Sequence, residues 1–221
     1  MLQTKDLTKR YLKRGETILA LDGVDLCFEP GELTVVQGPS GSGKTTLLLM
    51  LGGMLTPTKG TVMHDDRDLY SLSALKRSAY RKHHVGFLFQ SFHLMPYLTV
   101  QDNIALPLAL RGEKSEVAER VAGAAKRVGL SSRLSHRPKE LSVGEQQRTA
   151  MARMLVGDPE IILADEPTGN LDKRNREIIA DCLEEERAKG KTIVLATHDE
   201  ELMKLGTALI LIEDGKVTAK E

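Results

Sequence analysis

The sequence predicts an α/β fold: a buried parallel sheet with one helix-rich insertion. Residues 161–164 and 192–196 are short and almost wholly apolar, as strands inside a parallel sheet are when both of their faces are covered. A charged segment at residues 181–189 has helical character and ends at Gly190. Residues 91–157 carry no strong strand pattern. Strands and helices that alternate in this way are typical of α/β domains.

The other elements follow in chain order. Residues 17–28 alternate in part between apolar and polar side chains, which predicts a strand, and residues 29–32 predict the turn after it. Residues 33–37 and 85–89 predict further buried strands. Within the insertion, Ala, Val, Lys and Arg recur at helical spacing over residues 116–128. Residues 208–217, with a turn at Glu213-Asp214-Gly215, predict a terminal hairpin.

Composition sets broad limits. The chain has 221 residues, enough for one well-buried core with a subdomain, and its 31 basic residues equal its 31 acidic ones. A balanced charge gives no indication of nucleic acid or acidic lipid as a partner. No apolar run reaches the roughly 18 residues of a membrane span, and the N-terminus lacks a signal-peptide core. Cys27 and Cys182 imply no disulfide framework. We expect a cytosolic protein whose membrane role, if any, comes through a partner.

The most informative stretch follows the strand at residues 33–37 and fits the phosphate-loop pattern G-x-x-x-x-G-K-[ST]. Glycines let successive backbone N–H groups converge on phosphate oxygens, and the following helix adds positive charge. Lys44 is expected to reach the β- and γ-phosphates, and Thr45 to bind Mg²⁺. The alternative is a plain glycine-rich turn. The predicted nucleotide-binding residues are Gly38, Pro39, Ser40, Gly41, Ser42, Gly43, Lys44, Thr45 and Thr46.

Two acids end the strand at residues 161–164. They lie at the carboxyl edge of the predicted sheet, where ligands of open α/β folds bind. Asp165 suits a Mg²⁺ ligand, and Glu166 suits a general base that polarises the attacking water. In isolation the pattern is only a strand with an acidic turn; the phosphate loop upstream favours the functional interpretation.

A third motif lies at residues 141–148. Ser142 and Glu145 fit a capping box that starts a helix, and Gly144 leaves room for a ligand near the backbone. Taken alone, this is an ordinary helix start. Beside a complete phosphate loop it predicts a second anion site, and so ATP shared between two copies of the chain.

Residues 141–148, Leu-Ser-Val-Gly-Glu-Gln-Gln-Arg, resemble the signature motif of ATP-binding cassette (ABC) ATPases. Other elements of that family follow in its order. Tyr11, before the first hairpin, is similar to the aromatic residue that stacks on adenine, and Gln90 to the Q-loop glutamine. Residues 169–172 resemble the D-loop, including Asp172, and His198 resembles the switch histidine. Val143 and Glu145 depart from the commonest signature, which has Gly and Gln there.

The resemblance implies a fold and a mechanism. The fold is a P-loop NTPase (RecA-like) core with an N-terminal antiparallel β-subdomain and an inserted α-helical subdomain. Residues 1–221 form a single domain, with the core at 1–90 and 158–221 and the helical subdomain at 91–157. Two head-to-tail copies enclose two ATP, each held by the phosphate loop of one copy and by Ser142 and Gly144 of the other. Glu166, His198, Lys44 and Gln90 are the implied catalytic residues.

The implied cofactors are ATP and Mg²⁺, with Thr45, Gln90 and Asp165 as metal ligands, and Tyr11 and Asp172 complete the nucleotide-binding set. Residues 89–108 and 164–172 are more specifically similar to the LolD/MacB group. There the ATPase drives a MacB/FtsX-like permease in lipoprotein release, in macrolide or peptide export, or in transmitting force across the envelope. The homodimer is therefore expected on the inner face of the membrane, held by an integral-membrane permease, with no nucleic acid partner.

Residues 91–99 are apolar and aromatic for a loop, and they form either local packing or a groove for a coupling helix of the permease. The alternative function is a soluble ABC ATPase that acts on nucleic acid or the ribosome. A DNA-repair member of the family would carry a long coiled-coil insertion, and a translation-associated one would carry two cassettes. A kinase or GTPase would lack residues 141–148. The histidines His64, His83 and His84, with Asp65 and Asp66, are interpreted as ordinary surface or core residues rather than a metal site.

Overall fold

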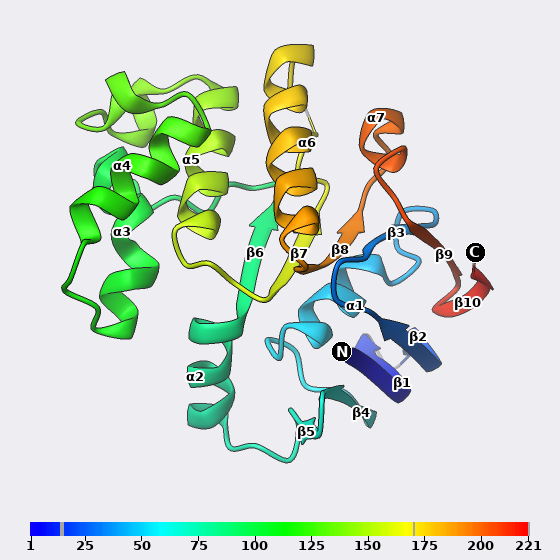
Figure 1. The fold of residues 1–221 in the computed structure, drawn as a ribbon. Helices are drawn as coiled ribbons and strands as arrows, with labels where there is room; N and C mark the ends of the chain where they lie inside the picture. Colours follow the sequence, from blue (N-terminus) through cyan, green and yellow to red (C-terminus); the bar gives the residue numbers. More distant parts are fainter. Residues whose placement is uncertain (14–15, 170, 221) are drawn as a thin grey trace.

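The computed structural model describes residues 1–13, 16–169 and 171–220, and it contains two sheets (Figure 1). The larger is six-stranded, in the order β10-β9-β3-β8-β7-β6. All of its neighbouring pairs are parallel except β9 and β10, which form the predicted terminal hairpin. Its strands are β3 (Leu33–Gln37), β6 (Val85–Phe89), β7 (Ile161–Asp165), β8 (Thr192–Ala196), β9 (Ala208–Glu213) and β10 (Lys216–Lys220). The predicted buried strands are confirmed.

Both faces of this sheet are covered, and alternate residues of each strand supply them. In β7, Ile162 and Ala164 pack into the core shared with the helices of the insertion. Ile161 and Leu163 point to the other side, into the core shared with the first helix and the N-terminal strands. Because successive side chains of a strand leave opposite faces, a strand buried on both sides must be apolar throughout. The continuous apolar runs in the sequence have this origin.

The second sheet is antiparallel and four-stranded, in the order β2-β1-β4-β5. Its strands are β1 (Leu2–Lys13), β2 (Glu16–Phe28), β4 (Lys59–His64) and β5 (Arg67–Asp68). The first hairpin is therefore β1–β2, and the prediction that Tyr11 precedes it is wrong, since Tyr11 pairs with Ile18 inside it. The register of β1 against β2 shifts three times, between Thr4 and Arg10. Each shift breaks the period-two pattern by which a strand is recognised in a sequence.

The helices lie on either side of the large sheet. In Figure 1, α3, α4 and α5 stand together at one end, away from β1, β2 and β4. Every residue from 91 to 157 is described, and none forms a strand. Two short 3₁₀ turns, η1 (Ser131–Arg133) and η2 (Pro138–Glu140), link α4 to α5. The helices are α1 (Lys44–Leu51), α2 (Ala74–His84), α3 (Val100–Arg111), α4 (Val117–Arg127), α5 (Val143–Leu155), α6 (Lys173–Ala188) and α7 (Glu200–Met203).

The helix predictions are right in part. The helix expected over residues 116–128 is α4, with Glu116 and Val128 as its caps. The helix expected over residues 181–189 begins earlier, at Lys173, because Asp172 caps it by accepting a hydrogen bond from the Asn175 backbone N–H. Its first turn is Lys-Arg-Asn-Arg and carries no apolar signal. The strongly basic α2 and the Pro107-containing α3 have no counterpart among the predicted elements.

None of the helices in the described ranges combines the length and the apolar character needed to cross a bilayer.

The fold predicts a large cost for truncating Leu163, which is 0% exposed in the core between β7 and α1. Leu163→Ala should lower the free energy of unfolding by about 2–5 kcal/mol, through lost burial and a cavity. Leu75→Ala is the matched control, because Leu75 is 82% exposed. It should change stability by no more than about 0.5 kcal/mol. Urea denaturation of both variants measures the difference, and equal costs would contradict this assignment of the core.

Candidate nucleotide-binding site

The predicted phosphate-binding loop and the predicted residues Gln90, Asp165, Glu166 and His198 meet at one edge of the large sheet. The phosphate loop follows β3, Gln90 follows β6, Asp165 ends β7 and His198 lies two residues beyond β8. Because these strands are parallel, their carboxyl ends share one edge. The register is direct, since Asp165 lies between Phe89 of β6 and Ala196 of β8. Strand pairing thus gathers groups that the sequence scatters over more than half of the chain.

The phosphate loop has a backbone that requires glycine. Gly38 has φ 150° and Gly43 has φ 111°. A Cβ atom at Gly38 would overlap the carbonyl oxygen of Ile212, and one at Gly43 would overlap that of Ala20. The loop is thus pressed against β9 and β2 on its inner side, while beside Gly41 the space is open. Its open side is therefore free to meet a ligand.

The loop holds a cation and an unsatisfied polar group, which fit an anionic ligand. The Lys44 ammonium donates to the carbonyl oxygens of Gly38 at 2.6 Å and Pro39 at 3.0 Å. The Ser42 hydroxyl is buried and has no hydrogen-bond partner among the described residues. A buried polar atom without a partner is costly unless a ligand or water satisfies it. A phosphate group fits this combination, and α1 begins at Lys44 itself.

Two of the three predicted Mg²⁺ ligands are hydrogen-bonded to each other. The Thr45 hydroxyl donates to the Asp165 carboxylate at 2.7 Å, across 120 residues of sequence. Oxygen donors of this kind suit Mg²⁺, which one or two protein groups hold together with phosphate oxygens. Gln90 lies at the same edge, with its side-chain amide against Gly169. Its role as a metal ligand stays a prediction.

Glu166 and His198 lie side by side. The Glu166 carboxylate is 3.5 Å from Nε2 of His198 and accepts a hydrogen bond from the His198 backbone N–H at 3.3 Å. Glu166 has φ 46°, unusual for a residue with a side chain, and its own N–H donates to the Ala196 carbonyl at 2.8 Å. Strained backbone of this kind concentrates at functional sites. The geometry places Glu166 beside His198, and the catalytic roles of the two residues stay predictions.

The predicted capping box at residues 142–145 is confirmed. Ser142 caps α5 by accepting from the Glu145 N–H at 3.2 Å, and Glu145 accepts from the Ser142 N–H at 2.9 Å. Glu145 also accepts from Arg133 at 2.8 Å. The Ser142 N–H and then Arg133 hold the pKa of Glu145 below its usual range. The departure from Gln at this position is thus accommodated by an ion pair.

The sequence interpretation assumed open space beside Gly144, but in the single chain this space is occupied. A Cβ atom there would overlap the side chain of Asn175 on α6. Asn175 is held in turn by Asp172, which accepts from its backbone N–H at 2.8 Å and from its amide at 2.9 Å. These bonds lower the pKa of Asp172. The signature helix and the D-loop therefore meet directly, although Asn170 of the D-loop lies outside the described residues.

Tyr11 pairs with Ile18 of β2, two residues before Ala20, whose carbonyl oxygen faces Gly43 of the phosphate loop. It is in β1, 39% exposed, with the Lys9 ammonium 5.2 Å from its ring centroid. An exposed aromatic face is suitable for stacking, and its assignment to adenine stays a prediction.

Comparison with known proteins agrees with this geometry. The ABC transporter family model matches residues 21–169, which contain the phosphate loop, both acids and the signature residues. The chain is 41% identical over 218 residues to an uncharacterised ABC transporter ATP-binding protein of Methanocaldococcus jannaschii, covering 98% of this chain and 97% of that one. The chain belongs to the ABC transporter family.

Two further relatives of this ABC cassette are informative. This chain is 40% identical over 216 residues to the macrolide export ATP-binding/permease protein MacB of Rhodopseudomonas palustris. The match covers 97% of this chain but only 33% of MacB. The structure of the ATP-binding cassette MJ0796, a dimer in a post-hydrolysis state with ADP and phosphate, superimposes with a TM-score of 0.95 at 39% identity, covering 100% of this chain and 98% of that one. The protein is an ABC ATPase of the LolD/MacB-like group, with ATP and Mg²⁺ as its cofactors.

One positioning residue has no role in the sequence interpretation. Gln147 is 1% exposed, and its amide donates to the Pro167 carbonyl at 2.6 Å and to the Phe89 carbonyl at 3.3 Å. It ties α5 of this ABC ATPase to the loop after Glu166 and to the residue before Gln90. Its sequence signal is a polar residue on the buried face of a helix, a position that requires partners.

Replacing the phosphate-loop lysine should weaken nucleotide binding. Lys44→Ala removes the cation held over the loop, and a hydrogen bond to a charged group contributes about 1.5–3 kcal/mol, so the Kd for Mg-ATP should rise about 10- to 100-fold. Titration with a fluorescent ATP analogue measures it. The control is Lys139→Ala, an exposed lysine in η2, which should bind as the wild type does. An unchanged Kd for Lys44→Ala would contradict the site.

Proposed function

We propose that two copies of this ABC ATPase close around two ATP and drive a separate MacB/FtsX-like permease. The supporting observation is that one chain presents half of a site. The side chains at the sheet edge face solvent, with His198 58% and Glu166 25% exposed. Among the residues that the structure describes, the Ser142 side chain bonds only within its own cap. A second copy would supply Ser142 and Gly144 across the nucleotide. The dimeric form of the MJ0796 cassette supports this arrangement.

Each residue of the half-site has a proposed part in hydrolysis. Lys44 neutralises charge on the β- and γ-phosphates, and Glu166 takes the proton of the attacking water. His198, 3.5 Å from the Glu166 carboxylate, contacts the γ-phosphate. Thr45, Asp165 and Gln90 would hold Mg²⁺, which when bound supplies further positive charge at the phosphates. Tyr11 stacks on adenine, and Asp172 positions the D-loop through Asn175.

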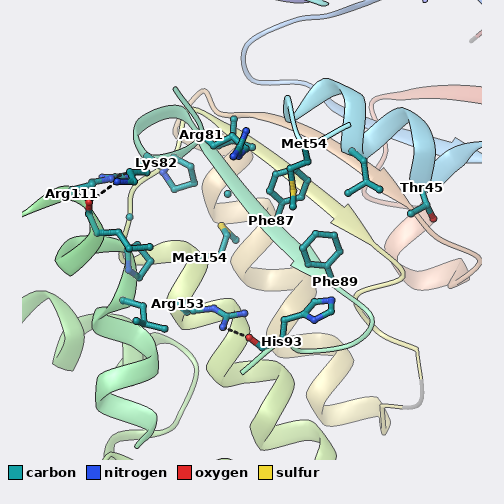
Figure 2. Close-up of a pocket in the computed structure, with 18 residues that line it drawn as sticks. Thr45, Met54, Arg81, Lys82, Phe87, Phe89, His93, Arg111, Arg153 and Met154 are labelled. Atoms are coloured by element: carbon teal, nitrogen blue, oxygen red, sulfur yellow. Dashed lines mark hydrogen bonds between the residues drawn. The ribbon is translucent and has the colours of Figure 1, made fainter. Parts of the chain in front are cut away.

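A cavity of about 730 Å³ beside the site is the proposed docking surface for the permease. Its apolar residues include Phe87, Phe89 and Met154, and basic side chains stand around them (Figure 2). The basic side chains are those of Arg81, Lys82, Arg111 and Arg153. The partner that fits is a helix with an apolar face and acidic residues at its edges.

The cavity adjoins the proposed nucleotide site. Thr45 lines it on one side, and Phe89 is the residue before Gln90. On the other side Arg153 donates to the carbonyl oxygens of His93 at 2.6 Å and Phe92 at 2.7 Å, which fixes the segment at residues 91–99 (Figure 2). The sequence left local packing and permease docking as alternatives for residues 91–99. We propose that the segment does both, since His93 lines the cavity while Tyr97 is 87% exposed. Residues 91–157 would then move as a helical subdomain against the core at 1–90 and 158–221.

The cargo class rests on relatives. MacB is named as an export protein that is both ATP-binding and permease, and this chain spans a third of it. We therefore propose that this chain sits on the cytoplasmic face of the membrane through its permease, in lipoprotein release, in macrolide or peptide export, or in force transmission. A soluble ABC ATPase that acts on nucleic acid or the ribosome is the alternative, and the formal net charge of +0 does not favour it.

Glu166→Gln should trap the ATP-bound dimer. The amide keeps the size of the side chain but cannot accept the proton of water, so turnover should fall about 100- to 10,000-fold while ATP still binds. Size-exclusion chromatography with saturating ATP should show a dimer for this variant and a monomer without nucleotide. Glu119→Gln, an exposed change on α4, is the control and should behave as the wild type. A Glu166→Gln protein that stays monomeric and turns over normally would refute the proposal.

The docking surface makes a separate prediction. Leu110 lines the cavity and is 60% exposed, so Leu110→Asp places a negative charge where an acidic partner would lie. In the Glu166→Gln background with ATP, this variant should recover at least tenfold less permease from detergent-solubilised membranes of the native host. Leu75→Asp, on a leucine outside the cavity, should recover as much as the parent. Equal recovery by both, or recovery of ribosomes or DNA in place of an integral-membrane protein, would count against the transporter.

A further inference from the structure

Three metal-binding side chains meet at the opposite edge of the large sheet from the nucleotide site. His84 is the last residue of α2, directly before β6, and Glu160 directly precedes β7. The two strands are parallel neighbours, so the residues before them lie together, and the Glu160 N–H donates to the His84 carbonyl at 3.1 Å. His64 is the last residue of β4, in the antiparallel sheet. The fold thus joins positions that lie far apart in the sequence.

The donor atoms are spaced as metal ligands are. Nδ1 of His84 is 2.9 Å from the Glu160 carboxylate, and Nε2 of His64 is 3.9 Å from the same oxygen. One ligand atom from each of the three residues lies within 4.8 Å of the other two. Ligands bound to Zn²⁺ at about 2.1 Å in a tetrahedron stand about 3.4 Å apart. The Asp65 carboxylate is 3.9 Å from Nε2 of His64, but it is ion-paired with the N-terminal ammonium at 2.7 Å and is not one of the three clustered residues.

The imidazole rings are held in place before any metal binds. Tyr80, which is 4% exposed, stacks on His84 with the ring centroids 4.9 Å apart and meets the edge of His64 at 5.6 Å. The cluster opens to solvent through a cavity of about 590 Å³, lined also by Asp66 and Arg67. Two imidazoles and a carboxylate are thus both ordered and accessible.

We propose that His64, His84 and Glu160 bind a divalent transition-metal ion, with Zn²⁺ the best match. Imidazole and carboxylate together suit Zn²⁺, Co²⁺ and Ni²⁺, whereas Mg²⁺ prefers oxygen ligands alone. The site is separate from the Mg²⁺ site at Thr45 and Asp165, which lies at the other edge of the sheet. Because His64 belongs to the antiparallel sheet and the other two ligands flank β6 and β7, the ion would join the β-subdomain to the core. The proposal is independent of transport.

The test uses untagged full-length protein, treated with a chelator and then titrated with Zn²⁺ by calorimetry in the presence of Mg²⁺. Wild type should bind one Zn²⁺ per chain, and Co²⁺ should give visible absorption bands of a tetrahedral site. His84→Ala should raise the Kd at least tenfold and remove the bands. His83→Ala is the matched control. His83 is next to His84 in the sequence but is exposed and outside the cluster, so this variant should bind Zn²⁺ as the wild type does.

A second readout separates lost binding from lost folding. Zn²⁺ should raise the melting temperature of wild type and of His83→Ala, and leave that of His84→Ala and Glu160→Gln unchanged, because only the first two retain all three ligands. If His84→Ala fails to fold, Glu160→Gln carries the comparison, since it changes only the charge of an exposed ligand. Zn²⁺ binding that is equal in wild type, His84→Ala and Glu160→Gln, or no Co²⁺ bands in wild type, would overturn the proposal.

Discussion

The parallel pairing of β6, β7, β8 and β3 is the constraint on which the rest of this protein depends. It places the ends of strands from distant parts of the chain side by side, so that Thr45 and Asp165 are in hydrogen-bond contact across 120 residues. No local sequence feature can do this. The pairing persists because alternate residues of each strand are buried in separate cores on the two faces of the sheet. A register slip by one residue would exchange every side chain between those cores and would separate the site residues as well.

The strand ends at the nucleotide site are also linked by hydrogen bonds to α5 and to the cavity proposed for the permease. Gln147 is hydrogen-bonded to the carbonyl oxygens of Phe89 and Pro167, so one buried amide on α5 contacts the chain on both sides of the proposed catalytic groups. Arg153, on the same helix, fixes residues 92 and 93 at the cavity proposed for the permease. A shift of α5 relative to β7 therefore has to change either these bonds or the shape of the cavity. In the proposed mechanism, movement of the helices and closure of the site would therefore occur together.

The features that could be predicted from the sequence are those encoded locally. A buried parallel strand is a short apolar run, a phosphate loop is a fixed pattern of glycines and lysine, and a capping box is a pair of residues three apart, as Ser142 and Glu145 are. Features that depend on tertiary contacts were missed. The register shifts in β1 conceal its period, and the first turn of α6 contains no apolar residue that would mark the start of the helix. The occupation of the space beside Gly144 by Asn175 could not be read from either segment alone.

The two edges of the large sheet differ in how much of their chemistry can be predicted from the sequence. At the carboxyl edge, motif and geometry coincide, since the residues proposed to bind phosphate are also those in the sequence motifs. At the amino edge, His64, His84 and Glu160 belong to no motif. His84 and Glu160 meet because β6 and β7 are parallel neighbours, and His64 joins them from the end of β4 in the other sheet. Residues that precede paired parallel strands must be adjacent, whatever their chemistry. When those residues are two imidazoles and a carboxylate, ordered by stacking on Tyr80, adjacency alone creates a coordination environment.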